Sequence, residues 1–96
     1  MPEISLRVLD PAGLHGRPAA RFVQIASRFT SSVTLGAGGR TANAKSMVGL
    51  LGLAVRPQSE ITITAEGDDA VAALAALLAE LGPTVEPTER GPAMPP

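Results

Sequence analysis

Two kinds of apolar spacing alternate along this chain, and their order limits the folds that it can adopt. Apolar residues occupy every second position in EISLRVL (residues 3–9) and in PQSEITITAEG (57–67), which is typical of strands with one buried face. Residues 18–29 and 68–82 instead carry apolar residues every three or four positions, as a helix with one buried face does. The spacing therefore predicts strands and helices in alternation, starting with a strand and ending with a helix.

The middle of the chain predicts a hairpin followed by a short helix. In SSVTLGAGGRTANA, Val33 and Leu35 alternate with polar neighbours, and residues 36–39 supply three glycines for a turn. Ser46 is suited to cap a short helix, and Gly52 to stop it. The complete order is β-α-β-β-α-β-α, which predicts an α+β open-faced sandwich with three helices on one face of a sheet.

The same spacing predicts which side chains form the core and which meet water. The first helix is expected to bury Ala19, Phe22, Val23, Ala26 and Phe29. The last helix is expected to bury a leucine stripe of Leu74, Leu77, Leu78 and Leu81. The sheet face away from the helices is expected to meet water through Ser5, Arg7, Thr34, Thr62 and Thr64.

The chain has the length of one small domain. Its 96 residues are enough for a single modest core. We expect the domain to cover residues 1–82, because Gly82 and Pro83 end the last helix. Residues 83–96 are rich in proline and poor in apolar residues, so we expect a disordered tail.

Composition argues against several classes of function. A net charge of −1 and only two aromatic residues do not suit nucleic-acid binding. One histidine and no cysteine do not suit a metal site, and no apolar run of about 20 residues predicts a membrane span. The N-terminus lacks the pattern of a signal peptide, so a cytoplasmic protein is expected.

The only histidine of the chain lies where the first helix is expected to begin. In AGLHGRPAA (residues 12–20), His15 stands between glycines, two positions before Arg17 and three before Pro18. Proline loses no hydrogen bond in a first helical turn. A helix N-terminus offers free N–H groups and a positive dipole end to an anion. Taken alone, His15 would be interpreted as an exposed loop histidine that caps the helix.

Two motifs together point to a family. GLHGRPAA, followed by FVQIASRF, resembles the active-site segment of the HPr family, the histidine-containing phosphocarriers of the bacterial phosphoenolpyruvate-dependent phosphotransferase system. NAKSMVGLLGL resembles the second signature of that family, around a serine, and ITITAEG resembles its last strand. The likeness covers about residues 3–81. It implies a four-stranded antiparallel sheet with three helices on one face.

The resemblance also implies site residues. His15 would be phosphorylated on Nδ1 by phospho-enzyme I and would pass the phosphoryl group to a sugar-specific enzyme IIA. Arg17 would stabilise the phosphoryl group, and no cofactor would be needed. Ser46 would be a regulatory site for a serine kinase and a phosphorylase, although a serine before a helix is more often only a cap.

The resemblance further implies a partner-binding surface, formed by the short helix and the start of the first one. Gly16 leaves space beside the histidine for the active site of a partner. Met47, Val48 and Leu51 are the candidates for an exposed apolar patch, since a short helix cannot bury all of its apolar residues. The chain itself is expected to be a monomer.

Two other functions remain open from the sequence. The chain could be an HPr-like regulatory protein, acting in a nitrogen-linked relay or controlling transcription through Ser46. It could also be a small αβ binding module without phosphotransfer, in which case His15 would be dispensable.

Overall fold

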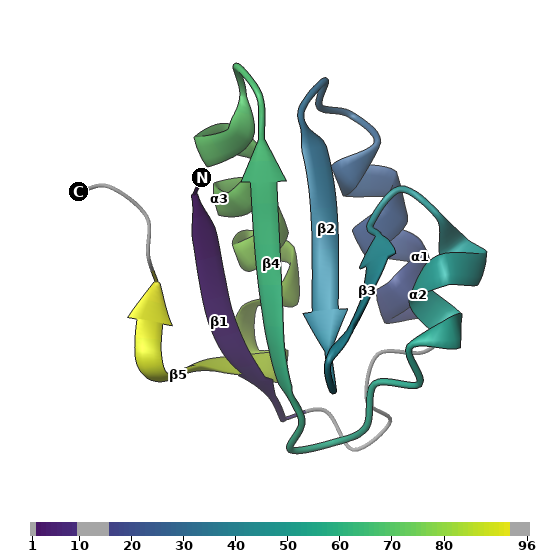
Figure 1. Cartoon of the computed structure of the whole chain (residues 1–96), viewed down its shortest axis with the longest axis vertical. Helices are drawn as coiled ribbons and strands as arrows, with labels where there is room; N and C mark the ends of the chain where they lie inside the picture. The colour runs from purple at the N-terminus through teal and green to yellow at the C-terminus, as the bar shows by residue number, and fades with distance from the viewer. Residues whose placement is uncertain (1, 10–15, 93–96) are drawn as a thin grey trace.

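The computed structural model describes residues 2–9 and 16–92, and its elements follow the order expected from the sequence, with one strand added at the end (Figure 1). The strands are β1 (Glu3–Val8), β2 (Ser32–Ala37), β3 (Arg40–Asn43), β4 (Glu60–Glu66) and β5 (Val85–Pro92). The helices are α1 (Gly16–Ala26), α2 (Met47–Gly52) and α3 (Ala70–Leu81), with a 3-10 turn, η1, at Gly82–Thr84.

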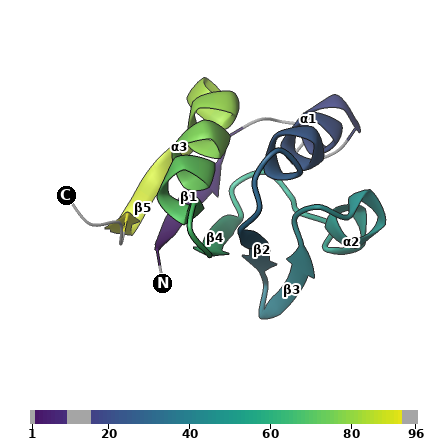
Figure 2. The same ribbon diagram turned by 90° about the horizontal axis from the view of Figure 1, so that it is seen from above.

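These strands form a single antiparallel sheet with helices on one face. The strand order is β3-β2-β4-β1-β5. Seen from above, the three helices lie on the same side of the sheet, and α1 lies between α2 and α3 (Figure 2). The predicted open-faced α+β sandwich is confirmed, with five strands among the described residues where the family resemblance implied four.

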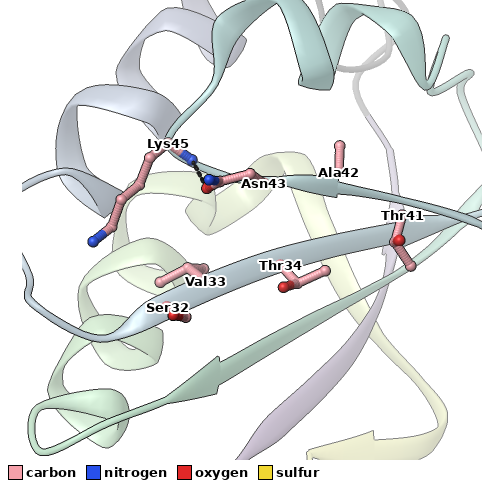
Figure 3. Close-up of a pocket in the computed structure, with 7 residues that line it drawn as sticks. All are labelled: Ser32, Val33, Thr34, Thr41, Ala42, Asn43 and Lys45. Carbon is pink, nitrogen blue, oxygen red and sulfur yellow. Dashed lines mark hydrogen bonds between the residues drawn. The ribbon is translucent and has the colours of Figure 1, made fainter.

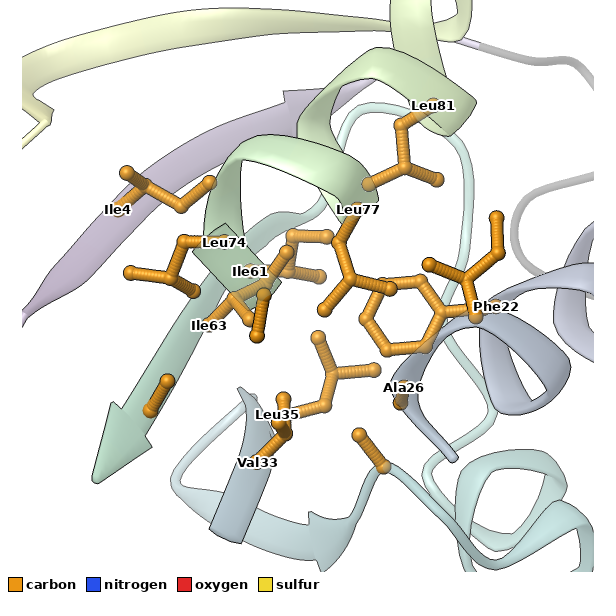
Figure 4. Packing of buried hydrophobic residues seen from close by; sticks show 14 of the residues in the cluster. Ile4, Phe22, Ala26, Val33, Leu35, Ile61, Ile63, Leu74, Leu77 and Leu81 are labelled. Atoms are coloured by element: carbon orange, nitrogen blue, oxygen red, sulfur yellow. The ribbon is translucent and has the colours of Figure 1, made fainter. Parts of the chain in front are cut away.

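The core lies between the sheet and α1 and α3 (Figure 4). Phe22 of α1 is fully buried beside Leu77 of α3, and Leu74 of α3 is buried over the sheet near Ile61 and Ile63. The alternation in the strands is confirmed, because the inward positions are buried. These positions are Ile4, Leu6, Val8, Val33, Leu35, Ile61, Ile63 and Ala65.

Two burial predictions were wrong, and one buried residue was not anticipated. That residue is Ile25, which is 6% exposed because α1 is covered on two sides by α2 and α3. Leu78 is 37% exposed, since it lies at the flank of the stripe that Leu74, Leu77 and Leu81 form. Ser5 is 4% exposed instead of facing water, and its hydroxyl lies 3.4 Å from the Thr62 hydroxyl of β4.

The prediction of a disordered tail was wrong for Val85–Pro92, which form β5 beside β1. The Leu9 N–H donates to the Thr84 carbonyl at 2.7 Å, and Val85 packs partly buried against the core. The tail is therefore attached by backbone pairing, by the apolar contact of Val85 and by an ion pair of Glu86 with Arg7, none of which can be inferred from composition. Residues 93–96 lie outside the described part of the chain.

Glycines at positive φ end two elements where the sequence predicted it. Gly38 and Gly39 have φ of 58° and 78° and close the hairpin between β2 and β3. Gly82 has φ of 42° and ends α3, with Pro83 behind it.

Candidate functional site

The sequence-predicted site lies at the start of α1. The helix begins at Gly16, directly after His15, so the prediction that it begins between His15 and Pro18 is confirmed. His15 itself lies outside the described residues. Arg17 belongs to the first turn of α1, but its side chain also lies outside the described part.

The first turn of α1 has the features of an anion-binding helix start. No acidic residue occupies it. The first N–H groups of a helix have no intrahelical partner, and the helix dipole places partial positive charge there. Pro18 removes one N–H at a position where no hydrogen bond is lost. An anion held by the residue before Gly16 would therefore meet a positive end that no local carboxylate neutralises.

The chain on both sides of the site is fixed to the rest of the fold. At the end of β1, the Val8 N–H donates to the Ser59 carbonyl at 2.9 Å, and the Gln58 N–H donates to the Val8 carbonyl at 2.7 Å. After the site, Arg21 in α1 forms an ion pair with Glu80 in α3 at 3.2 Å. Phe22 anchors the same helix in the core.

Ser46 caps α2, as the sequence predicted. Its Oγ accepts a hydrogen bond from the Gly49 N–H at 3.1 Å, and its backbone is extended, with φ of −114° and ψ of 112°. This geometry is that of an N-cap. The Ser46 side chain is half-buried. The regulatory role of Ser46 stays a prediction.

Lys45 holds the segment in front of Ser46, a contact that the sequence analysis did not foresee. Its N–H donates to Asn43 Oδ1 at 2.9 Å, and its Nζ donates to the Phe29 carbonyl at 2.7 Å. Figure 3 shows Lys45 and Asn43 beside a hollow over β2 and β3. The hollow is lined by Ser32, Val33, Thr34, Thr41, Ala42, Asn43 and Lys45. These side chains include no carboxylate, thiol or imidazole, so the lining offers no pair of groups for acid-base chemistry.

The three residues predicted to dock partners differ in exposure. Val48 is 83% exposed and Leu51 is 41% exposed. Met47 is half-buried and packs against the core. The apolar surface of α2 is therefore centred on Val48 and Leu51, and we call these two residues the α2 patch. α2 packs against α1, the helix that begins after His15.

Asp69 is the polar anchor that the sequence analysis missed. Its carboxylate accepts hydrogen bonds from the Thr30 N–H and the Ser31 N–H, both at 2.9 Å, and from both hydroxyls. The Ser31 hydroxyl and then the Thr30 N–H lower the pKa of Asp69 from 3.8 to about 2, because they stabilise the ionised form. The sequence indicated only an acidic helix start; the partners lie 38 and 39 positions away.

The Asp69 cluster lies far from the start of α1. Thr30 and Ser31 follow the C-terminal end of this helix, which is 11 residues or roughly 16 Å long. Asp69 therefore fixes the connection from α1 to β2 and is remote from the start of α1.

The described residues hold no group of three or more histidine, cysteine, aspartate or glutamate side chains that could bind a metal ion. Among those same residues, no helix has the length and apolar character needed to cross a membrane.

Comparison with known proteins identifies the family. Residues 2–81 match the family described as the PTS HPr component phosphorylation site. The HPr-like protein Crh of Bacillus subtilis (strain 168) is 52% identical over 79 residues, which cover 82% of this chain and 93% of Crh. The chain therefore belongs to the HPr family of phosphocarriers.

Solved structures agree with this assignment. The crystal structure of the phosphocarrier protein HPr from Bacillus anthracis str. Ames matches with a TM-score of 0.76 and 46% identity, over 81% of this chain and 93% of that one. A solid-state NMR structure of the dimer Crh matches with a TM-score of 0.62 and 51% identity, over 72% and 81%. The family match ends at residue 81 of this chain, so β5 lies outside the matched residues.

Proposed function

We propose that this chain accepts a phosphoryl group from phospho-enzyme I on Nδ1 of His15 and passes it to a sugar-specific enzyme IIA in the cytoplasm. The observation that carries the proposal is that α1 begins at the residue after the only histidine, with no acidic side chain in its first turn. In the first step the bond from phosphorus to enzyme I breaks as the bond to Nδ1 of His15 forms, and in the second step that N–P bond breaks as the bond to enzyme IIA forms. The phosphoryl group is therefore conserved, and no cofactor is required.

Imidazole suits a carrier that must both accept and release a phosphoryl group. It is largely neutral near pH 7, so its nitrogen lone pair can attack phosphorus. The positive end of α1 and the guanidinium of Arg17 would stabilise the charge on the phosphoryl oxygens. Gly16 adds no side chain beside the histidine, which leaves access for the active sites of two different partners.

The α2 patch supports the assignment of a docking role to α2. Val48 is 83% exposed, so its side chain adds little burial free energy to the isolated chain and is available for burial against a partner. α2 packs beside α1, so a partner that covers Val48 and Leu51 lies next to the helix that follows His15. Met47 contributes from its half-buried position at the start of α2.

A regulatory function is the second candidate. It is favoured by the 52% identity to Crh, which is named an HPr-like protein and not a phosphocarrier. In this alternative a serine kinase and a phosphorylase act on Ser46, and the chain serves a nitrogen-linked relay or controls transcription. The half-buried Ser46 Oγ is already engaged with Gly49, so a kinase would have to open the first turn of α2.

Labelling with enzyme I and radioactive phosphoenolpyruvate, followed by acid treatment, tests the carrier proposal. The carrier proposal predicts acid-labile label that His15→Ala abolishes, with unchanged circular dichroism. Arg17→Ala should slow transfer about ten- to a hundredfold, as expected for loss of a charge-assisted contact of about 1.5–3 kcal/mol. Arg28→Ala removes an exposed arginine after the other end of α1 and is the matched control. Label that persists in His15→Ala contradicts the proposal.

We propose that the chain is a monomer, whereas Crh was solved as a dimer. In this chain β5 pairs with β1 at one end of the sheet.

A further inference from the structure

The turn η1 fastens the C-terminal end of β1 to the C-terminal end of α3. The Leu9 N–H donates to the Thr84 carbonyl at 2.7 Å, and the preceding residue, Val8, pairs with Val85 at the start of β5 (Figure 1). The Thr84 hydroxyl donates to the Leu81 carbonyl of α3 at 2.6 Å. Thr84 therefore joins β1 to α3, through its carbonyl on one side and its hydroxyl on the other.

Thr84 also lies beside the first turn of α1. A hollow of about 210 Å³ between α1, α3 and η1 is lined by Pro18, Arg21, Glu80, Leu81 and Thr84. Pro18 is half-buried and belongs to the first turn of α1. Leu9 and Pro18 stand before and after residues 10–15, and Thr84 is next to both of them.

The segment between Leu9 and Pro18 carries the histidine. The two residues are nine positions apart, and His15 lies between them. The conformational freedom of a chain segment falls when both of its ends are held in place. A reacting group that is misplaced by about 1 Å can lose on the order of a hundredfold in rate. A residue that holds both ends of the segment is therefore suited to position the histidine without touching the phosphoryl group.

We propose that Thr84 is a positioning residue for phosphoryl transfer at His15, and that it acts through Leu9 and through the first turn of α1. This inference rests on the carrier function proposed above. The Thr84 hydroxyl fixes η1 on the end of α3, and the Thr84 carbonyl then holds Leu9. Thr84 lies outside residues 2–81, so the family match does not supply this role.

The test removes the Thr84 hydroxyl and keeps the shape of the side chain. Thr84→Val loses the hydrogen bond to Leu81, whereas Thr84→Ser retains a hydroxyl that can form it. The rate of a single transfer from phospho-enzyme I is measured over a range of carrier concentrations. Thr84→Val should lower the maximal rate about two- to tenfold, the range that one hydrogen bond accounts for. Thr84→Ser should restore the rate.

The half-saturating carrier concentration should be the same for Thr84→Val and the wild type. Thr84 is half-buried in η1 and is not part of the α2 patch, so association with enzyme I does not depend on it. A loss confined to the maximal rate is expected when an interaction contributes only to the transition state.

Thr30→Val is the matched control for loss of a threonine hydroxyl. The Thr30 hydroxyl donates to Asp69 at 3.3 Å, and Thr30 follows the other end of α1. Each variant loses one hydroxyl hydrogen bond, so their melting temperatures should fall by similar amounts. Thr30→Val should nevertheless transfer at the wild-type rate, because its hydroxyl is remote from Leu9 and Pro18.

The results separate failure of the inference from failure of the proposed function. If the wild type is phosphorylated and Thr84→Val, with a native circular dichroism spectrum, reacts at the wild-type rate, Thr84 does not position His15. If Thr30→Val is slowed as much as Thr84→Val, the effect is one of stability and the inference is wrong. A wild-type chain that is not phosphorylated by enzyme I overturns the carrier function itself.

Discussion

Replacing Gly67 by alanine should destabilise the fold more than any other glycine substitution available in a described turn. Gly67 connects β4 to α3 and has φ of 143°, a conformation that L residues with a side chain rarely adopt. An added Cβ would lie 2.5 Å from Ser31 Oγ and 2.9 Å from Ser31 Cα. The second contact is with backbone, so rotation of the Ser31 side chain cannot relieve the clash.

The expected magnitude follows from these two effects. The backbone strain of a side chain at such φ is of order 1–3 kcal/mol. The clash adds to it, because Ser31 must move and its hydrogen bonds to Asp69 must lengthen. For a domain of this size, about 1 kcal/mol lowers the melting temperature by roughly 4–8 °C. We therefore expect Gly67→Ala to lower it by at least about 4 °C.

Thermal denaturation followed by circular dichroism measures this effect, with Gly52→Ala as the matched control. Gly52 lies in the last turn of α2, and an added Cβ there meets nothing within 4 Å. Its replacement should leave the melting temperature unchanged or raise it, because glycine in a helix costs about 0.5–1 kcal/mol relative to alanine. Equal melting temperatures for Gly67→Ala and the wild type would refute the reasoning.

Three further predictions concern Asp69, Ser46 and the α2 patch. The pKa of Asp69 is about 2 when folded against 3.8 ordinarily, so its stabilisation is complete above about pH 4 and is lost as pH falls towards 2. The Asp69→Asn variant should therefore be less stable than the wild type at neutral pH, and its melting temperature should change less with pH between pH 4 and 2. A pH dependence equal to that of the wild type would contradict this prediction. Ser46→Asp should keep the melting temperature, because an anion is favoured at the start of α2, while slowing phosphorylation by enzyme I; Ser46→Ala should lose the cap, about 0.5–2 kcal/mol. If the Ser46→Asp variant is phosphorylated at the wild-type rate, Ser46 serves only as the N-cap of α2. Val48→Asp should weaken association with enzyme I in titration calorimetry and leave melting unchanged, whereas equal affinity would place the docking surface elsewhere.

Local patterns were sufficient to predict most of the fold. Alternation in β1 and β4 predicted the buried positions, because a strand with one covered face repeats every two residues. The Ser46 cap and the end of α3 at Gly82 were also predictable, since both depend on residues within one turn of the helix end.

What the sequence did not reveal depends on contacts between distant positions. β5 has the composition of a disordered tail and becomes a strand only because β1 offers an edge. Asp69 resembles an ordinary acidic helix start, and its bonds to Thr30 and Ser31 exist only once α3 and the end of α1 are adjacent.

The sequence motifs of the site were recognisable, but the exposure of its side chains was only partly predictable. The two signatures identified the family, and the position of the α1 start was inferred correctly from Pro18 and the helical spacing. Exposure along α2 was not fully predicted. Met47 fills the core side of α2, because a helix of six residues has few positions from which to anchor itself.

The central claim is that His15 both receives and gives up one phosphoryl group. Intact-mass spectrometry of the wild-type chain tests it directly, first after enzyme I and phosphoenolpyruvate are added, and again after an enzyme IIA is added. The account predicts a gain of the mass of one phosphoryl group, absent in His15→Ala, which disappears when enzyme IIA is supplied and reappears on that protein. A chain that gains no mass from enzyme I, or that keeps the added mass in the presence of enzyme IIA domains, would contradict it.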